Sequence, residues 1–218
     1  MSVPIKLDAN QGFQREAIDS IVEIFGGQDI VEQGLTIAGF DDENKFESFQ
    51  ELVFGNTLDL DPETVRKNLR RVQERPVALE DGSMRPVVPE PDRLDLRPGE
   101  MPIHFSIEME TGTGKTYVYL RTVFELNQRY GFNKFVIVVP SVAIKEGVYK
   151  SLQMMEDHFR SLYANVPFEY FLYDSSKLGQ VRNYATSSHI QVMVVTVGAI
   201  NKKDVNNLYN GSGKTGGE

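Results

Sequence analysis

The residues best suited to chemistry lie in one short run, Thr111-Gly112-Thr113-Gly114-Lys115-Thr116. Glycines at alternate positions allow neighbouring backbone N–H groups to point toward one ligand. This composition is typical of a loop that binds nucleotide phosphates. Lys115 would reach the β- and γ-phosphates of ATP, and the Thr116 hydroxyl would bind Mg²⁺. The general pattern has a further glycine five positions before the second glycine of the run, where this chain has Met109.

The elements around this run have the order that a phosphate loop requires. Apolar alternation predicts a strand over residues 103–109, and helical spacing predicts a helix over residues 115–130, ended by Gly131. The helix N-terminus adds partial positive charge at the loop. A second Gly-x-Gly-Lys-Thr at residues 211–215 has neither a strand before it nor a helix after it, so we expect residues 206–218 to be a flexible tail.

Downstream of the loop, apolar strands alternate with helices. Strands are predicted over residues 134–139, 169–173 and 190–197, and a long helix begins at Ser141. Residues 135–139 of the first of these strands are all apolar, which predicts burial on both faces of a parallel sheet. The predicted fold class is α/β, a P-loop (RecA-like), doubly wound and mainly parallel sheet, in which ligands bind beyond the carboxyl ends of the strands.

The part of the chain before the loop is less regular. A helix is predicted over residues 10–25, with Phe13, Ala17, Ile21 and Ile24 on one face, and another from Asp61 to Arg75. Residues 76–98 predict an extended connection or a hairpin. The expected organisation is an N-terminal helix in 1–28, an insertion in 29–100 and an incomplete P-loop (RecA-like) domain in 101–205, before the tail.

Composition indicates an ordinary globular chain. Its 218 residues are 40% hydrophobic and 25% charged, without cysteine, a signal-peptide pattern or a run of about 18 apolar residues. We therefore expect a cytoplasmic protein without a membrane partner. The net charge of −8 argues against a broad electrostatic grip on nucleic acid. Five cations cluster in the predicted helix at 61–75, and a solvated helix face explains them more simply than a phosphate-binding surface: Arg66, Lys67, Arg70, Arg71 and Arg75.

Three further groups could act with the loop. Gln14 has an amide that can pair with an adenine edge. Pro140 and Ser141 follow a strand and begin a helix, where a hydroxyl and amides suit a DNA or RNA phosphate. Thr196 and Gly198 lie at the end of another predicted strand and could meet the same nucleic-acid backbone. Taken singly, each group is equally explained by a helix start, a capping serine or ordinary turn chemistry.

In order and spacing, these groups resemble the motifs of superfamily 2 helicases and translocases. Gln14 resembles their Q motif, residues 111–116 motif I, residues 139–143 motif Ia and residues 196–198 a later strand-end motif. That family usually replaces the first glycine of the loop, which accounts for Met109. The amino-acid sequences of residues 107–119 and 135–148 are most similar to those of the restriction (Res) subunit of type III restriction–modification enzymes. The resemblance covers Gln14 and most of residues 102–200.

This resemblance implies an ATP-driven motor on double-stranded DNA, in a larger subunit with a C-terminal nuclease and a DNA methyltransferase (Mod) partner. The implied roles are ATP and Mg²⁺ binding at Gln14 and residues 111–116, and DNA contact at Pro140, Ser141, Thr196 and Gly198. Such motors need an Asp-Glu motif at a strand end, which we do not find. We therefore expect an N-terminal fragment that does not hydrolyse ATP. Two alternatives remain: another superfamily 2 DNA or RNA helicase, and a non-catalytic nucleotide-binding module.

Overall fold

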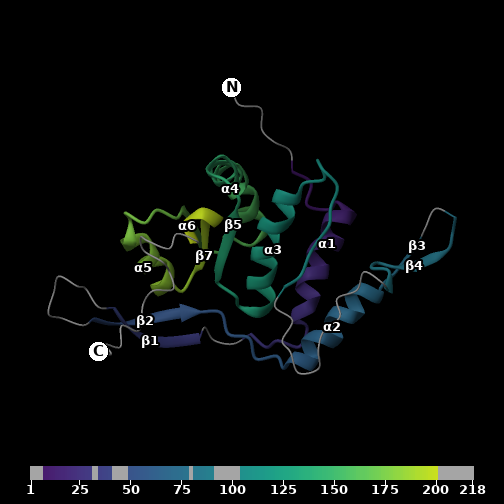
Figure 1. Cartoon of the computed structure of the whole chain (residues 1–218), viewed down its shortest axis with the longest axis horizontal. Helices are drawn as coiled ribbons and strands as arrows, with labels where there is room; N and C mark the ends of the chain where they lie inside the picture. The colour runs from purple at the N-terminus through teal and green to yellow at the C-terminus, as the bar shows by residue number, and fades with distance from the viewer. Residues whose placement is uncertain (1–6, 31–33, 41–48, 79–80, 91–103, 201–218) are drawn as a thin grey trace, which may run out of the picture. The chain divides into compact units, whose positions relative to one another are not determined.

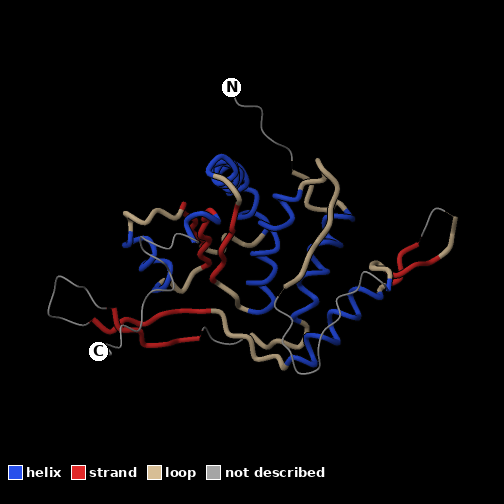
Figure 2. Tube along the Cα trace, viewed as in Figure 1, coloured by secondary structure: helices blue, strands red, loops and turns tan. Residues whose placement is uncertain are grey.

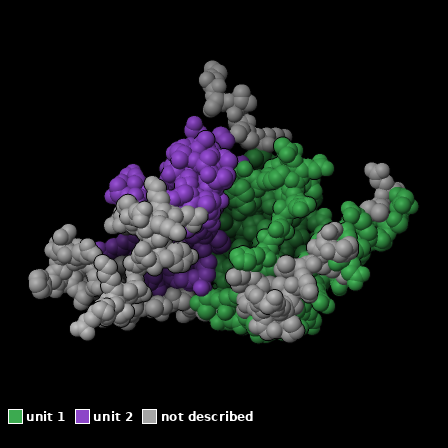
Figure 3. Space-filling model, viewed as in Figure 1, with its two compact units in different colours: residues 1–32, 57–132 green, residues 33–56, 133–218 purple. Residues whose placement is uncertain are grey.

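The structure is a computed structural model that describes residues 7–30, 34–40, 49–78, 81–90 and 104–200 (Figure 1). The chain forms two compact units, coloured separately in Figure 3. The first comprises residues 1–32 and 57–132, and the second comprises residues 33–56 and 133–218. The domain boundaries expected from the sequence remain a prediction, and the segment 206–218 lies outside the described residues.

The first unit is mainly helical. Helices α1 and α3 lie side by side in it, and α2 runs from the short helix that follows α1 to a small hairpin (Figure 1). Its elements are α1 (Gly12–Val22), η1 (Glu23–Phe25), α2 (Pro62–Glu74), β3 (Pro76–Ala78), β4 (Met84–Pro86) and α3 (Lys115–Tyr130). Strands β3 and β4 pair antiparallel, which confirms the hairpin expected in the proline-rich segment.

Helix α3 has the bounds that the sequence predicts, because both of its ends are fixed by local chemistry. Gly114 caps its N-terminus with φ +87° and Gly131 ends it with φ +74°, a left-handed conformation that glycine adopts without steric cost. The Gly131 N–H donates to the carbonyl of Asn127 at 2.8 Å. Leu120, at 1% exposure, and its buried neighbours form the side of α3 that lies in the core.

Helix α1 forms within the predicted range, but only part of the predicted apolar face is buried: Ile24, in η1, is in the core, whereas Phe13 is not. Gln14, Ile18 and Val22 are the buried residues of the helix, while Phe13 is 51% exposed. The predicted apolar spacing began at Phe13. The stripe that is buried begins one residue later, at Gln14, and a search for apolar residues does not find it because Gln14 is polar. Gln14 is buried at 8% exposure because its amide is hydrogen-bonded.

Helix α2 confirms the prediction from Asp61-Pro62. The Asp61 carboxylate accepts hydrogen bonds from the N–H groups of Glu63 and Thr64, at 2.9 and 3.0 Å, and from the Thr64 hydroxyl at 2.6 Å. These bonds satisfy N–H groups that a helix start leaves without an internal partner. The apolar face of the helix packs with Ile24 and is buried as expected, at Val65, Leu69 and Val72.

We expect Asp61→Ala to lower the melting temperature, and Asp61→Asn to retain most of it because asparagine also caps helices. The Thr64 hydroxyl and the two amides hold the pKa of Asp61 below its ordinary value. The cap is therefore at full strength above the unfolded pKa and is lost as pH falls through the folded pKa. Thermal unfolding followed by circular dichroism, at neutral and acidic pH, tests both statements. Equal melting temperatures for Asp61→Ala and the wild type would show that water replaces the cap.

The second unit contains the parallel sheet that the sequence predicts. Its strands are β5 (Lys134–Val139), β6 (Phe168–Leu172) and β7 (Ile190–Thr196), in the order β5-β7-β6 and all parallel. The connections are α4 (Val142–Leu162) and α5 (Leu178–Thr186), and α6 (Val197–Ile200) follows β7. The central strand β7 is buried from Ile190 to Val195, as its apolar run predicts. The fold class is α/β.

Burial of β5 on both faces was a wrong prediction. Val136 and Val138 are 47% and 49% exposed, so one face of β5, an edge strand of the described sheet, is open. The sequence also did not predict the antiparallel hairpin of β1 (Gly34–Phe40) and β2 (Phe49–Gly55). After β2, the Asn56 side-chain oxygen accepts from the N–H groups of Asn133 and Lys134 at 2.8 and 3.0 Å, which anchors the start of β5.

The strand predicted over residues 103–109 does not form in its described part. Residues 104–110 have an irregular, mostly exposed backbone that Figure 2 draws as a loop leading into α3. A strand exists only when another strand pairs with it, and no sheet pairing is described for this segment. Helices of the described part are all too short or too polar to cross a lipid bilayer.

Candidate functional site

The glycine-rich run forms a tight turn directly before α3. Gly112 and Gly114 both adopt left-handed backbone conformations, with φ +82° and +87°. Gly114 is the N-cap, and its carbonyl accepts from the Val118 N–H at 3.0 Å. The 16-residue helix therefore begins immediately after the loop, and its first N–H groups are available to a ligand. This is the geometry of an anion site at a helix N-terminus.

Lys115 is folded back into the turn. Its ammonium group donates to the carbonyl of Met109 and to that of Glu110, the latter at 2.7 Å. The carbonyl of Glu110 also accepts from the Thr113 hydroxyl at 2.6 Å. The described residues give Lys115 no carboxylate partner, so neutral carbonyls alone hold this cation. A bound polyphosphate would replace these carbonyls with stronger, charge-assisted partners.

Thr116 lies in the first turn of α3, where its hydroxyl is hydrogen-bonded to the phenol of Tyr119. Burial raises the pKa of Tyr119, and the hydrogen bond with Thr116 opposes this rise. The Tyr119 phenol therefore stays protonated near neutral pH. Because this bond lowers the pKa, the Thr116 hydroxyl is its donor and the Tyr119 oxygen its acceptor, so the oxygen lone pairs of Thr116 stay available to a cation.

Gln14 is in direct contact with the loop, although 99 positions separate it from Thr113. Its side-chain Nε2 donates to the Thr113 carbonyl at 2.9 Å. A Cβ placed on Gly114 would lie 2.5 Å from the same nitrogen, which is closer than any real contact. The loop, the N-terminus of α3 and the amide of Gln14 therefore form one packed arrangement. From the sequence alone, only the resemblance to known motifs indicates that Gln14 and the loop act together.

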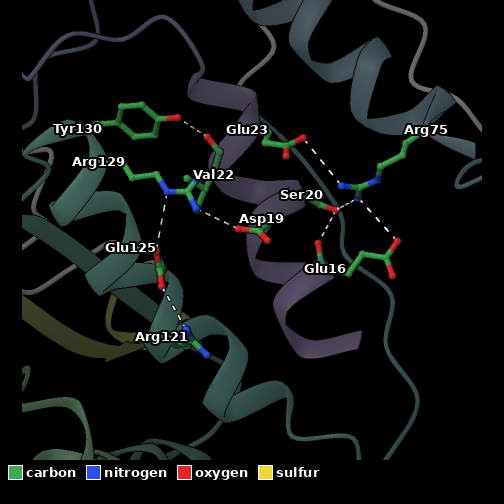
Figure 4. Close-up of polar contacts among 10 residues, drawn as sticks. All are labelled: Glu16, Asp19, Ser20, Val22, Glu23, Arg75, Arg121, Glu125, Arg129 and Tyr130. Atoms are coloured by element: carbon green, nitrogen blue, oxygen red, sulfur yellow. Dashed lines mark hydrogen bonds and ion pairs between the residues drawn. The ribbon is translucent and has the colours of Figure 1, made fainter. Parts of the chain in front are cut away.

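Side chains of α3 hold α1 along its length, and sequence reasoning missed them. Arg121, at 8% exposure, donates to the Ala9 carbonyl at 2.5 Å just before α1 begins. Farther along, Arg129 pairs with Asp19 at 3.2 Å and the Tyr130 hydroxyl donates to the Val22 carbonyl at 2.9 Å (Figure 4). These contacts fix the position of α1, and hence of Gln14, relative to the loop. Their only sequence signal is a polar stripe on an otherwise apolar helix.

The other predicted site residues gather at the carboxyl end of the sheet in the second unit. Val139 at the end of β5 and Thr196 at the end of β7 are partners in the parallel register. Pro140 and Ser141 follow β5 directly, and both are exposed. The Ser141 hydroxyl accepts from the Ile144 N–H at 3.3 Å and so caps α4. The structure therefore places Ser141 and Thr196 on neighbouring strand ends.

Gly198 lies in α6, two residues beyond the end of β7, and no described residue other than its chain neighbours and its own helix comes within 4 Å of the position of an added Cβ. The predicted residues thus form two groups in different units. Gln14 and residues 111–116 belong to the first unit, and the strand-end residues belong to the second. Each group is internally consistent with its predicted chemistry.

Comparison with known proteins identifies the lineage of the chain. The sequence profile of the family described as "Type III restriction enzyme, res subunit" matches residues 13–216. The chain belongs to this family. Membership confirms the resemblance drawn from Gln14 and the loop, and it agrees with the parallel α/β sheet.

Relatives in this Res subunit family show the same lineage. The Res subunits of the type III restriction-modification enzymes EcoPI, from Escherichia phage P1, and EcoP15I, from Escherichia coli, are each 34% identical over 119 residues. Each match covers 47% of this chain and 12% of the relative. The StyLTI Res subunit of Salmonella typhimurium strain LT2 is 48% identical over 68 residues, or 30% of this chain and 7% of the relative. The chain therefore corresponds to a small part of the length of these relatives.

Proposed function

We propose that this chain is the ATP-binding part of a DNA-translocating motor in a type III restriction endonuclease. The observation that carries the proposal is the contact between Gln14 and the turn that caps α3. In that contact, a side chain able to pair with adenine touches the loop able to hold phosphates. Family membership supports the same assignment.

Within this proposed function, each predicted nucleotide-binding residue of the first unit has a distinct role. The N–H groups of residues 112–116 hold phosphate oxygens, and Lys115 leaves the carbonyls of Met109 and Glu110 to pair with the β- and γ-phosphates. Thr116 binds the Mg²⁺ that accompanies the nucleotide, and Gln14 pairs with the adenine. When bound, ATP provides the phosphoryl transfer that drives the motor.

The strand-end residues of the second unit are proposed to contact DNA. Pro140, Ser141, Thr196 and Gly198 line the carboxyl edge of the sheet with exposed or half-exposed positions. Amides at the start of α4 and the hydroxyls of Ser141 and Thr196 suit phosphodiester oxygens, which position a duplex without reading its sequence. The full-length protein is proposed to cleave double-stranded DNA through a nuclease outside these residues, to work with a methyltransferase (Mod) subunit, and to be cytoplasmic.

We propose further that these 218 residues bind ATP without hydrolysing it. Hydrolysis in such motors requires an Asp for Mg²⁺ and a Glu for the attacking water at a strand end. Of the three parallel strands, only β6 is closely followed by an acid, Asp174, whose carboxylate accepts hydrogen bonds from the Ser176 hydroxyl and N–H at 2.7 and 3.0 Å. DNA-stimulated hydrolysis that Lys115→Ala abolishes would contradict this proposal.

Calorimetric titration with ATP, with and without Mg²⁺, tests the proposed function directly. We expect saturable binding that strengthens with Mg²⁺, because the cation neutralises phosphate charge beside Thr116. Absence of binding by a folded chain would sink the proposal and would favour a module whose loop has lost its ligand.

The role of Gln14 predicts a change in base selectivity. Gln14→Ala should weaken ATP binding about threefold to tenfold, the effect of losing one hydrogen bond, while GTP binding changes much less. Parallel ATP and GTP titrations of both proteins measure this difference. If the substitution weakens both nucleotides equally, Gln14 supports the loop and does not read the base.

A further inference from the structure

Helix α2 has two faces of opposite character. Val65 and Leu69 pack with Ile24 on the buried face. The exposed positions of the helix are all charged: Glu63, Lys67, Arg70, Arg71 and Glu74. A protein-binding surface usually has apolar or aromatic residues at its centre, and this face has none. Interfaces with DNA, in contrast, are more polar and more positively charged than interfaces between proteins.

The structure divides the five cations of this helix into two sets. Arg66 is 8% exposed and pairs with Glu63 at 2.8 Å. Arg75 turns toward α1, where it donates to the Ser20 hydroxyl at 2.6 Å and lies 3.9 Å from the carboxylates of Glu16 and Glu23 (Figure 4). These two arginines therefore serve the fold, which the sequence alone could not show.

The remaining three cations of the helix make no comparable contacts with the described residues. Lys67, Arg70 and Arg71 are exposed, and the described residues provide none of them with a hydrogen bond or an ion pair. They lie within about one helical turn, or roughly 6 Å along the axis. A solvated helix face usually intersperses acids at the i+3 and i+4 positions. Here Arg70 and Arg71 occupy those spacings after Lys67, and the acids among the exposed positions of the helix, Glu63 and Glu74, lie at the two ends of this run.

The hairpin β3–β4 adds a further exposed cation beyond the C-terminal end of α2. The N–H groups of Val87 and Val88 donate to the carbonyls of Arg75 and Gln73, both at 2.9 Å, and so attach the hairpin to the end of α2. Figure 1 shows the hairpin continuing from the C-terminal end of the helix. Arg85 in β4 is exposed and likewise has no hydrogen bond or ion pair among the described residues. Four cations without a hydrogen bond or ion pair among the described residues thus lie on α2 and the attached hairpin, in a chain whose net charge is −8.

We propose that the basic face of α2, formed by Lys67, Arg70 and Arg71 and extended by Arg85, binds the phosphodiester backbone of duplex DNA. Arginine matches phosphate geometry through paired N–H groups, and a duplex presents about one negative charge per 1.7 Å of its axis. The contact is independent of sequence and of nucleotide. It is separate from the strand-end residues at the carboxyl edge of the sheet, and it does not depend on ATP binding.

Salt dependence of DNA binding tests this proposal. Fluorescence anisotropy with a labelled random duplex of about 30 base pairs is measured without ATP at salt concentrations between about 50 and 200 mM. A plot of log affinity against log salt concentration has a negative slope. We expect Arg70→Gln/Arg71→Gln to reduce the magnitude of this slope by about 1.8, and Lys67→Gln alone to reduce it by about 0.9. The matched control Lys150→Gln/Lys177→Gln removes two exposed cations elsewhere and should leave the slope unchanged. Circular dichroism verifies that each variant is folded.

Equal slopes for the wild type and Arg70→Gln/Arg71→Gln would overturn the proposal. So would a variant that loses binding to polyglutamate but keeps its affinity for the duplex, because an acidic protein partner would then be the better assignment. ATP titration of Arg70→Gln/Arg71→Gln separates this result from the nucleotide site. The proposed basic face predicts unchanged ATP binding, and failure of ATP binding in the wild type would leave the slope difference intact.

Discussion

Lys115→Ala is expected to weaken ATP binding by about 10- to 100-fold, because a hydrogen bond to a charged group contributes about 1.5–3 kcal/mol. The ammonium group is the cation closest to the phosphates in the proposed complex. It is also exposed, and its partners in the structure are only the carbonyls of Met109 and Glu110. The substitution should therefore change the melting temperature very little. Calorimetric titration and thermal unfolding measure the two effects separately.

A matched substitution at another exposed lysine makes the Lys115 result specific. Lys150→Ala removes the same side chain from α4 in the second unit and should leave ATP affinity at the wild-type value. If Lys115→Ala binds ATP as tightly as the wild type, the triphosphate does not lie at the start of α3. A large loss of stability in Lys115→Ala would instead show that the ammonium group holds the turn together.

Elements whose ends depend on neighbouring residues could be predicted from the sequence. Helix α3 begins after Gly114 and stops at Gly131, and α2 begins after Asp61, as expected from the chemistry of glycine and of a capping carboxylate. The parallel strands were also identified, since runs such as that of β7 are apolar from end to end. In each of these cases the information lies within a few residues of the element.

Features that depend on distant partners could not be predicted. The strand expected at 103–109 needs a neighbouring strand for its backbone hydrogen bonds, and the exposure of one face of β5 depends on what packs against that face. The buried face of α1 was missed because Gln14 is buried through its bond to Thr113, far along the chain. For the same reason, only the structure shows that Arg66 and Arg75 serve the fold while Lys67, Arg70 and Arg71 remain exposed.

The second large effect is expected at Gly114, where backbone conformation and close packing coincide. Gly114→Ala places a side chain at φ +87°, a left-handed conformation that costs about 1–2 kcal/mol for a non-glycine residue. It also places Cβ 2.5 Å from the Nε2 of Gln14, so the glutamine must leave the Thr113 carbonyl. We expect a lower melting temperature together with loss of measurable ATP binding.

Gly112→Ala separates the two causes. Gly112 has nearly the same backbone conformation, with φ +82°, but no described residue other than its chain neighbours comes within 4 Å of an added Cβ. Its substitution should therefore show the backbone cost alone and reduce stability less than Gly114→Ala. In a Gln14→Ala background the clash is gone, so Gly114→Ala should then cost only about as much as Gly112→Ala, a non-additivity that a double-mutant cycle measures. If the Gly112→Ala and Gly114→Ala variants unfold at the same temperature, Gln14 does not pack against the loop, and its proposed place beside the nucleotide is lost with that contact.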